Sequence, residues 1–108
     1  KEHALIQILP RVEYYADLMQ ISHLYTNVKT TSANTKRWSC SSRGVLMFHR
    51  KLSKCPISIV DYVVVHELAH LIHFNHSRNF RSLVEEYHPQ YKISKRRLKE
   101  NWNGLWLW

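Results

Sequence analysis

The segment Pro56–Phe74 constrains the fold more strongly than any other part of the sequence. It is almost continuously apolar, yet it contains several histidines and a glutamate. Pro56 suits a helix start, and Ser58 followed by Asp61 resembles a capping box with Asp in place of Glu or Gln. We therefore predict a helix from about Pro56 or Ser58 to Phe74. The residues expected to anchor it in a core are Val63, Leu68, Leu71 and Ile72.

Size and composition favour one compact, soluble domain. The chain has 108 residues, of which 44% are hydrophobic, so residues 1–108 can form a single domain with one core. The longest nearly apolar run, Ile57–Val65, is well short of the roughly 20 residues that a membrane span needs, and the start lacks a signal-peptide pattern. We expect a monomeric, cytoplasmic protein with no membrane partner, in which Cys40 and Cys55 are reduced thiols.

The segments before the central helix predict one helix and a small sheet. Pro10, followed by apolar residues at helical spacing, predicts an N-terminal helix from about Pro10 to Gln20. Between Ile21 and Arg50, the stretches HLYTNVKTT, TKRWSC and VLMFHRKL predict two or three strands, the last after a turn at Gly44. We expect these strands to form a small, mainly antiparallel sheet.

Two further helices are predicted after the central one, which completes an α+β fold. Ser77 can cap the first, and His88-Pro89 ends it. Ser94 can cap the last, which runs through Trp102. The first of these helices has one apolar stripe, formed by Phe80, Leu83, Val84 and Tyr87.

His66, Glu67 and His70 form an HExxH pattern inside the central helix. Residues four apart on a helix differ by about 40° in direction and about 6 Å in height, so both imidazoles can reach one metal ion. Glu67 lies about 60° around from His70, beside the ion, where it can act as a base. The metal would activate a bound water, and Glu67 would pass its proton to the leaving amine.

His76 is the expected third metal ligand. It completes HExxHxxxxxH, which has the ligand spacing of the metzincin signature. Asn75 is a natural helix stop, so the chain can turn there and bring His76 back to the ion. Three neutral nitrogen ligands leave a fourth position for water, as catalytic Zn²⁺ requires. A structural zinc is the minor alternative, because Cys40 and Cys55 lack zinc-finger spacing.

Other residues are alternatives for parts of this site. His73 stands where metzincins have a glycine, and it could be a competing ligand, a substrate-side donor or a cap. Glu85 or Glu86 could supply a carboxylate ligand, as in gluzincins. Candidates for stabilising an oxyanion are Tyr87, His88, Tyr91 and His73.

The net charge of +8 raises nucleic acid as a partner. The excess gathers in the last predicted helix, beside several tryptophans, at Lys92, Lys95, Arg96, Arg97 and Lys99. Basic residues next to aromatic ones can bind phosphates and stack on bases. We favour the simpler interpretation, a solvated basic helix with Leu98 and Trp102 packed inward.

Three separated motifs together resemble one known family. The stretches TKRWSCSSRG, DYVVVHELAHL and NHSRNF are similar to the YgjP-like metallopeptidase domain, a bacterial and archaeal group of metal-dependent hydrolases. The likeness runs in order from about Thr35 to Pro89. It departs from the family pattern where a glycine is missing between Trp38 and Ser39, and where Arg81 replaces an aromatic residue and adds positive charge near the expected cleft.

The resemblance implies a compact zincin-like domain related to the SprT-like and Wss-type proteases. It implies zinc on His66, His70 and His76, with Glu67 as general base. The sequence therefore favours a zinc-dependent peptidase that cleaves peptides or proteins through a metal-bound water activated by Glu67. The alternative is a nucleic-acid-associated protein in which the zinc site is structural or serves an accessory protease.

Overall fold

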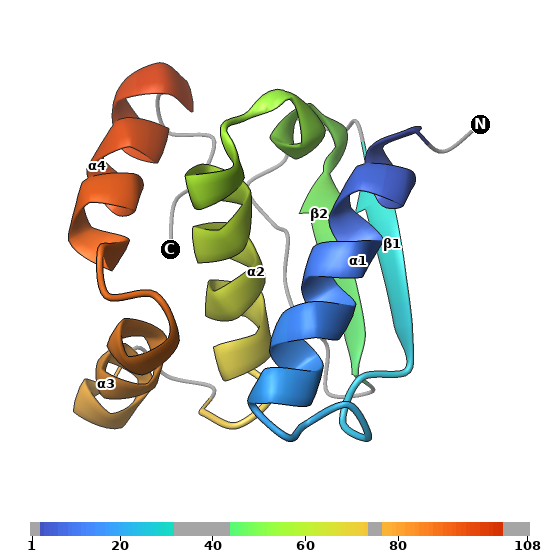
Figure 1. The fold of residues 1–108 in the computed structure, drawn as a ribbon, viewed down its shortest axis with the longest axis vertical. Helices are drawn as coiled ribbons and strands as arrows, with labels where there is room; N and C mark the ends of the chain where they lie inside the picture. The colour runs from blue at the N-terminus through green and yellow to red at the C-terminus, as the bar shows by residue number, and fades with distance from the viewer. Residues whose placement is uncertain (1–2, 32–43, 74–76, 103–108) are drawn as a thin grey trace.

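The central helix of the fold is enclosed on both sides. The computed structural model describes residues 3–31, 44–73 and 77–102. Helix α2 (Ile57–Ala69) lies in the middle of the molecule, with α1 (His3–Leu18) and a two-stranded sheet on one side and α3 (Arg78–Tyr87) and α4 (Tyr91–Trp102) on the other (Figure 1). This arrangement confirms the α+β class and the order of one helix, a sheet region and three helices.

Helix α2 is buried along nearly its whole length, as its sequence requires. Every residue from Ile59 to Ala69 is buried, and α2 contacts α1, α3 and α4. A helix that is apolar on all faces is stable only when other elements cover it. The surrounding elements therefore shield the helix that contains the HExxH motif from solvent.

The bounds of α2 differ from the prediction in two ways. The helix starts where expected, but its N-cap is Pro56 without a side-chain cap bond, so the capping box of Ser58 and Asp61 is wrong. The helix ends at Ala69 rather than Phe74 because its last turn tightens. The amides of Leu71 and Ile72 bond three residues back, to Leu68 and Ala69, as in a 3₁₀ turn.

Helix α1 begins seven residues before the predicted start, at His3 instead of Pro10. Pro10 lies inside the helix, where it cannot donate to the carbonyl of Ile6. Both residues are on the exposed face, so water can satisfy that carbonyl. Burial of Ala4 and Ile8 on the opposite face outweighs the cost of the proline.

The described strands are parallel, which corrects the expected antiparallel sheet. Strand β1 (Asn27–Thr31) pairs with β2 (Val45–His49) in parallel register, with Val28 opposite Leu46. Alternation along a strand predicts its faces but not its direction, and residues 32–44 provide the dozen or so residues that a parallel connection needs. The predicted strand in TKRWSC lies outside the described residues.

Helix α3 agrees with the sequence prediction. Ser77 is its N-cap and accepts a hydrogen bond from the amide of Phe80 at 3.3 Å, and His88 is its C-cap. The predicted stripe faces inward, with Phe80 and Val84 buried.

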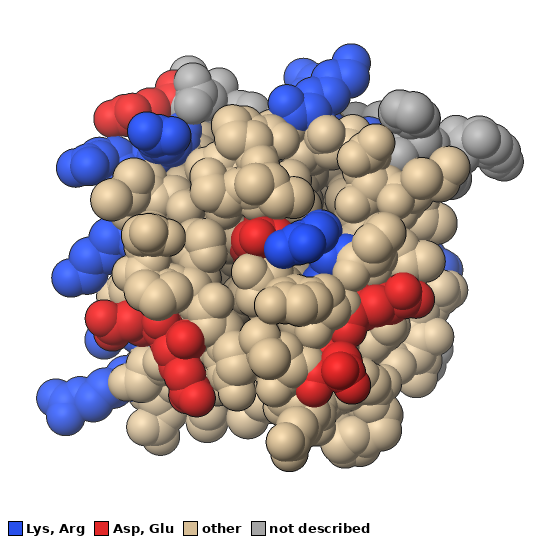
Figure 2. Space-filling view, in the orientation of Figure 1, with Lys and Arg blue, Asp and Glu red and all other residues tan. Residues whose placement is uncertain are grey.

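Helix α4 starts at Tyr91, so the predicted cap at Ser94 is wrong. Ser94 is buried inside the helix, and its Oγ lies 2.8 Å from Nε2 of His88. Because a buried hydroxyl needs a partner, this bond ties α4 to the end of α3. Leu98 packs inward as predicted, while the side chain of Trp102 lies outside the described residues. Lys and Arg side chains project along the side of the molecule where α4 lies (Figure 2).

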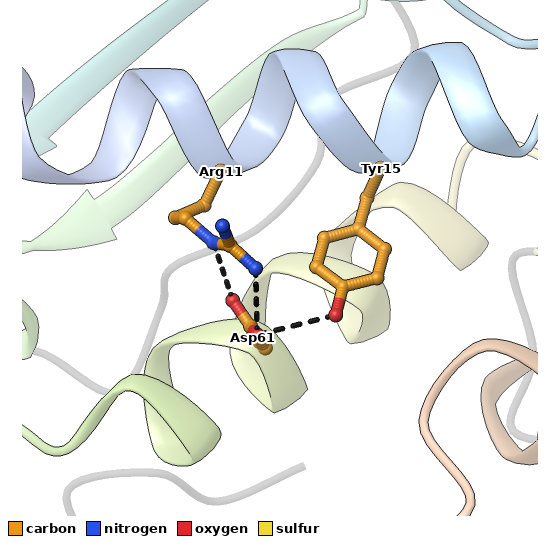
Figure 3. A network of polar contacts seen from close by, with 3 residues as sticks. All are labelled: Arg11, Tyr15 and Asp61. Atoms are coloured by element: carbon orange, nitrogen blue, oxygen red, sulfur yellow. Dashed lines mark hydrogen bonds and ion pairs between the residues drawn. The ribbon is translucent and has the colours of Figure 1, made fainter.

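A polar network joins α1 to α2 (Figure 3). Arg11 donates from Nε to Oδ1 of Asp61 at 2.8 Å and from Nη2 to Oδ2 at 2.9 Å. Tyr15 donates its hydroxyl to Oδ2 of the same carboxylate at 3.2 Å. The hydrogen bond with Asp61 raises the pKa of Arg11, and burial together with the Asp61 charge raises the pKa of Tyr15. Asp61 is thus held by a two-point ion pair, five residues before His66 on the same helix.

No helix in the described part of the chain is long and apolar enough to cross a membrane.

We predict that Asp61→Ala lowers the free energy of unfolding by about 1–3 kcal/mol, because it leaves Arg11 and Tyr15 without their acceptor in a partly buried site. Chemical denaturation measures this change. The matched control is Asp17→Ala, which removes an exposed carboxylate from α1 and should change stability by less than about 0.5 kcal/mol. Equal losses in the two variants would contradict a stabilising role for the network.

Candidate metal centre

Helix α2 brings His66 and His70 together. His66 is buried inside the helix, and His70 is the C-cap with φ −66° and ψ −19°, which is still helical backbone. The four-residue spacing therefore keeps its helical geometry although the helix ends at Ala69. The two ring centroids are 4.8 Å apart, in an edge-to-face arrangement. The prediction that both imidazoles share one face is confirmed by this contact.

The backbone of His73 orients the ring of His70. Nδ1 of His70 lies 3.2 Å from the carbonyl oxygen of His73. Since a carbonyl only accepts, Nδ1 is the donor in this contact, and in the neutral imidazole Nε2 is then the nitrogen with the lone pair. Metal-binding histidines usually have such a second contact, which fixes the tautomer and the ring orientation. No sequence pattern predicts this role, because every residue has a backbone carbonyl.

Glu67 is a buried carboxylate that directly follows His66 and lies three residues before His70. Its side chain is about 2% exposed, and Oε2 lies 3.7 Å from Nδ1 of His66. Oε1 is buried and has no hydrogen-bond partner among the described residues. Burial raises the pKa of Glu67 well above its usual value, because it disfavours the charged form. Such a group is costly in a protein unless a cation or a polar ligand approaches it.

Phe80 packs the two imidazoles from α3. Its ring stacks on His70 with centroids 4.6 Å apart and meets His66 edge-on at 5.0 Å. Tyr62, one helical turn before His66, contacts the same imidazole at 5.8 Å. The sequence identified Phe80 only as part of an apolar stripe. The structure shows that it also limits the rotation of both rings.

His76, the predicted third ligand, lies outside the described residues together with Phe74 and Asn75, so its role stays a prediction. Within the described residues, no group of three His, Cys, Asp or Glu side chains could hold a metal. Glu85 and Glu86 are exposed on α3. Among the oxyanion candidates, His88 is buried against Ser94, and Tyr91 lines a pocket that also includes His66.

The imidazole pair of His66 and His70 nevertheless fits part of a metal site. Two imidazoles lie in contact, and a carbonyl oxygen lies within hydrogen-bond distance of Nδ1 of one of them. Oε1 of Glu67, which lies between them in sequence, has no hydrogen-bond partner in the described part of the chain. Nitrogen donors with a nearby carboxylate suit Zn²⁺, and a cation would also offset the cost of burying Glu67.

Comparison with known proteins adds one finding. A family model described as "YgjP-like, metallopeptidase domain" matches residues 1–101. This match confirms the resemblance inferred from three motifs and extends it beyond residues 35–89 in both directions. The searches of curated proteins and of solved structures found no match.

We predict that Phe80→Ala weakens metal binding by about 10-fold to 100-fold, because it removes the packing that orients both imidazoles. It should also cost about 3–5 kcal/mol of stability. The control is Val84→Ala, which truncates another buried residue of α3 and should lower stability with little effect on affinity. Competition with a chromogenic chelator measures the affinity. Equal affinities in the two variants would show that Phe80 serves packing alone.

Proposed function

Because the chain belongs to the YgjP-like metallopeptidase family, we propose that it is a zinc-dependent peptidase with Glu67 as its general base. In this proposal His66, His70 and His76 hold the metal, and the substrate is a peptide or protein. The family supports a metal-dependent protease. The choice of zinc, the ligand set and the role of Glu67 are the proposed parts.

One observation supports the assignment most strongly. The buried Glu67 directly follows His66, one of the two imidazoles in contact, and its Oε1 has no hydrogen-bond partner among the described residues. A site built only for structure would not need such a carboxylate, since leaving a buried polar atom unpaired costs about 1–3 kcal/mol. A base that must accept a proton from an arriving water needs an unoccupied oxygen.

The residues of the chain divide the reaction between them. When bound, zinc would supply Lewis acidity, which acidifies water and polarises a carbonyl. Glu67 accepts the proton as water attacks the peptide carbonyl, and returns it to the leaving nitrogen as the C–N bond breaks. Phe80 and the His73 carbonyl keep the imidazoles oriented throughout.

We predict that Glu67→Gln retains about one zinc per chain and lowers kcat for a peptide library by at least about 1000-fold, since the amide cannot take up a proton. Metal content by elemental analysis and cleavage by mass spectrometry are the measurements. His76→Ala is the contrasting variant, which should lose zinc. Unchanged turnover in Glu67→Gln would contradict the mechanism, and full zinc in His76→Ala would contradict the ligand assignment.

Nucleic-acid binding is a second candidate function, supported by the basic face of α4. Five cations are exposed on this helix, against the single exposed carboxylate of Glu100: Lys92, Lys95, Arg96, Arg97 and Lys99. A phosphate-binding surface should lose affinity for a DNA duplex steeply as salt rises. Fluorescence anisotropy at several salt concentrations tests this, and addition of a chelator should leave the binding unchanged. Absence of binding at low salt would leave α4 as a solvated helix.

A further inference from the structure

A pocket of about 70 Å³ lies between α2, α3 and α4, and His66 forms part of its wall. The same imidazole contacts His70 in the proposed metal site. One ring therefore belongs both to that site and to the pocket. A substrate side chain in the pocket would lie beside the bond that is cleaved.

The inner wall of the pocket is apolar. Tyr62, Phe80 and Val84 line it, and all three are buried. These side chains offer a surface for the methylene or methyl groups of a single amino-acid residue.

The outer wall is cationic. Arg81 from α3 and Lys95 from α4 line the pocket, and both side chains are exposed. Tyr91 adds a phenol at the same pocket. Of the described residues that line it, none is Asp or Glu. Two positive charges from different helices at one pocket create a local potential that favours an anion and disfavours a cation.

We propose that this pocket binds a carboxylate on a short apolar stem, which makes the protein a peptidase selective for acidic or terminal residues beside the scissile bond. The inference rests on the proposed peptidase function and adds a substrate class to it. The stem packs on Tyr62, Phe80 and Val84, while the carboxylate faces Lys95 and Arg81. Lysine and arginine side chains are rejected at this position by like charge.

The carboxylate has two sources, a Glu or Asp side chain and the C-terminus of a peptide. Peptides matched except for Glu, Gln or Lys at each position, with free or amidated C-termini, distinguish them. We expect the wild type to prefer one carboxylate source over its amide by about fivefold to tenfold in kcat/KM. A Glu preference identifies the side chain, and a loss on amidation identifies the terminus. Equal cleavage of all peptides would overturn the proposal while leaving the peptidase function intact.

Charge reversal at the pocket tests the residues. Lys95→Glu should remove the preference and improve cleavage of the Lys peptide. The matched control is Lys54→Glu, which reverses an exposed lysine of the 3₁₀ helix η1 (Arg50–Lys54), outside the pocket lining. It should retain the preference. The same loss in both variants would show that net charge, and not the pocket, sets selectivity.

A binding measurement separates this proposal from the peptidase proposal. N-acetylglutamate amide has only the side-chain carboxylate, and N-acetylalanine only the terminal one. Each is titrated into the purified protein beside its neutral amide, and NMR follows the Val84 methyl and Tyr91 ring signals. The proposal is supported, even if no peptide is cleaved, when a carboxylate compound shifts these signals and its neutral amide does not. In Lys95→Glu the shifts should be at least fivefold smaller. Equal shifts with charged and neutral compounds would overturn it.

Discussion

The fold depends on the burial of one helix. Every residue of α2 from Ile59 to Ala69 is removed from water, and covering so much apolar surface requires neighbours on every side. α1 and the sheet provide one wall, and α3 and α4 provide the other (Figure 1). The polar groups on this helix then have to be satisfied inside the protein. Asp61 achieves this with Arg11 and Tyr15, whereas the nearest described group to Oε2 of Glu67 that the ion-pair geometry gives is Nδ1 of His66, at 3.7 Å.

The two buried carboxylates of α2, Asp61 and Glu67, differ in how their burial is compensated. Asp61 has three hydrogen bonds and an opposite charge, so its burial is compensated within the protein. Glu67 is more deeply buried, and its Oε1 has no hydrogen-bond partner within residues 3–31, 44–73 and 77–102. Burying Glu67 costs stability, which other interactions of α2 have to offset. The ion pair between Arg11 and Asp61 is one such interaction.

The parts of the structure that sequence could predict are those governed by local periodicity. The four-residue spacing placed His66 and His70 on one face, and the Ser77 cap and the stripe of α3 followed from short-range rules. Other features depend on tertiary context. Pro10 lies inside α1 because the burial of Ala4 and Ile8 outweighs a lost hydrogen bond. Ser94 bonds His88 instead of capping α4, and the parallel pairing of β1 with β2 depends on where the chain crosses over. His76, the proposed third ligand, lies outside the described residues, so its role stays a prediction.

The contact between His70 and residue 73 has a consequence for how this site can vary. The group that fixes the imidazole is a main-chain oxygen, so any amino acid at position 73 that keeps the turn can supply it. The side chain of His73 takes no part in this contact. A substitution of His73 would therefore leave the tautomer of His70 unchanged. What the orientation of His70 does require is the tightened turn after Ala69. An insertion or deletion of one residue between positions 70 and 73 would therefore disturb the site more than the loss of a side chain.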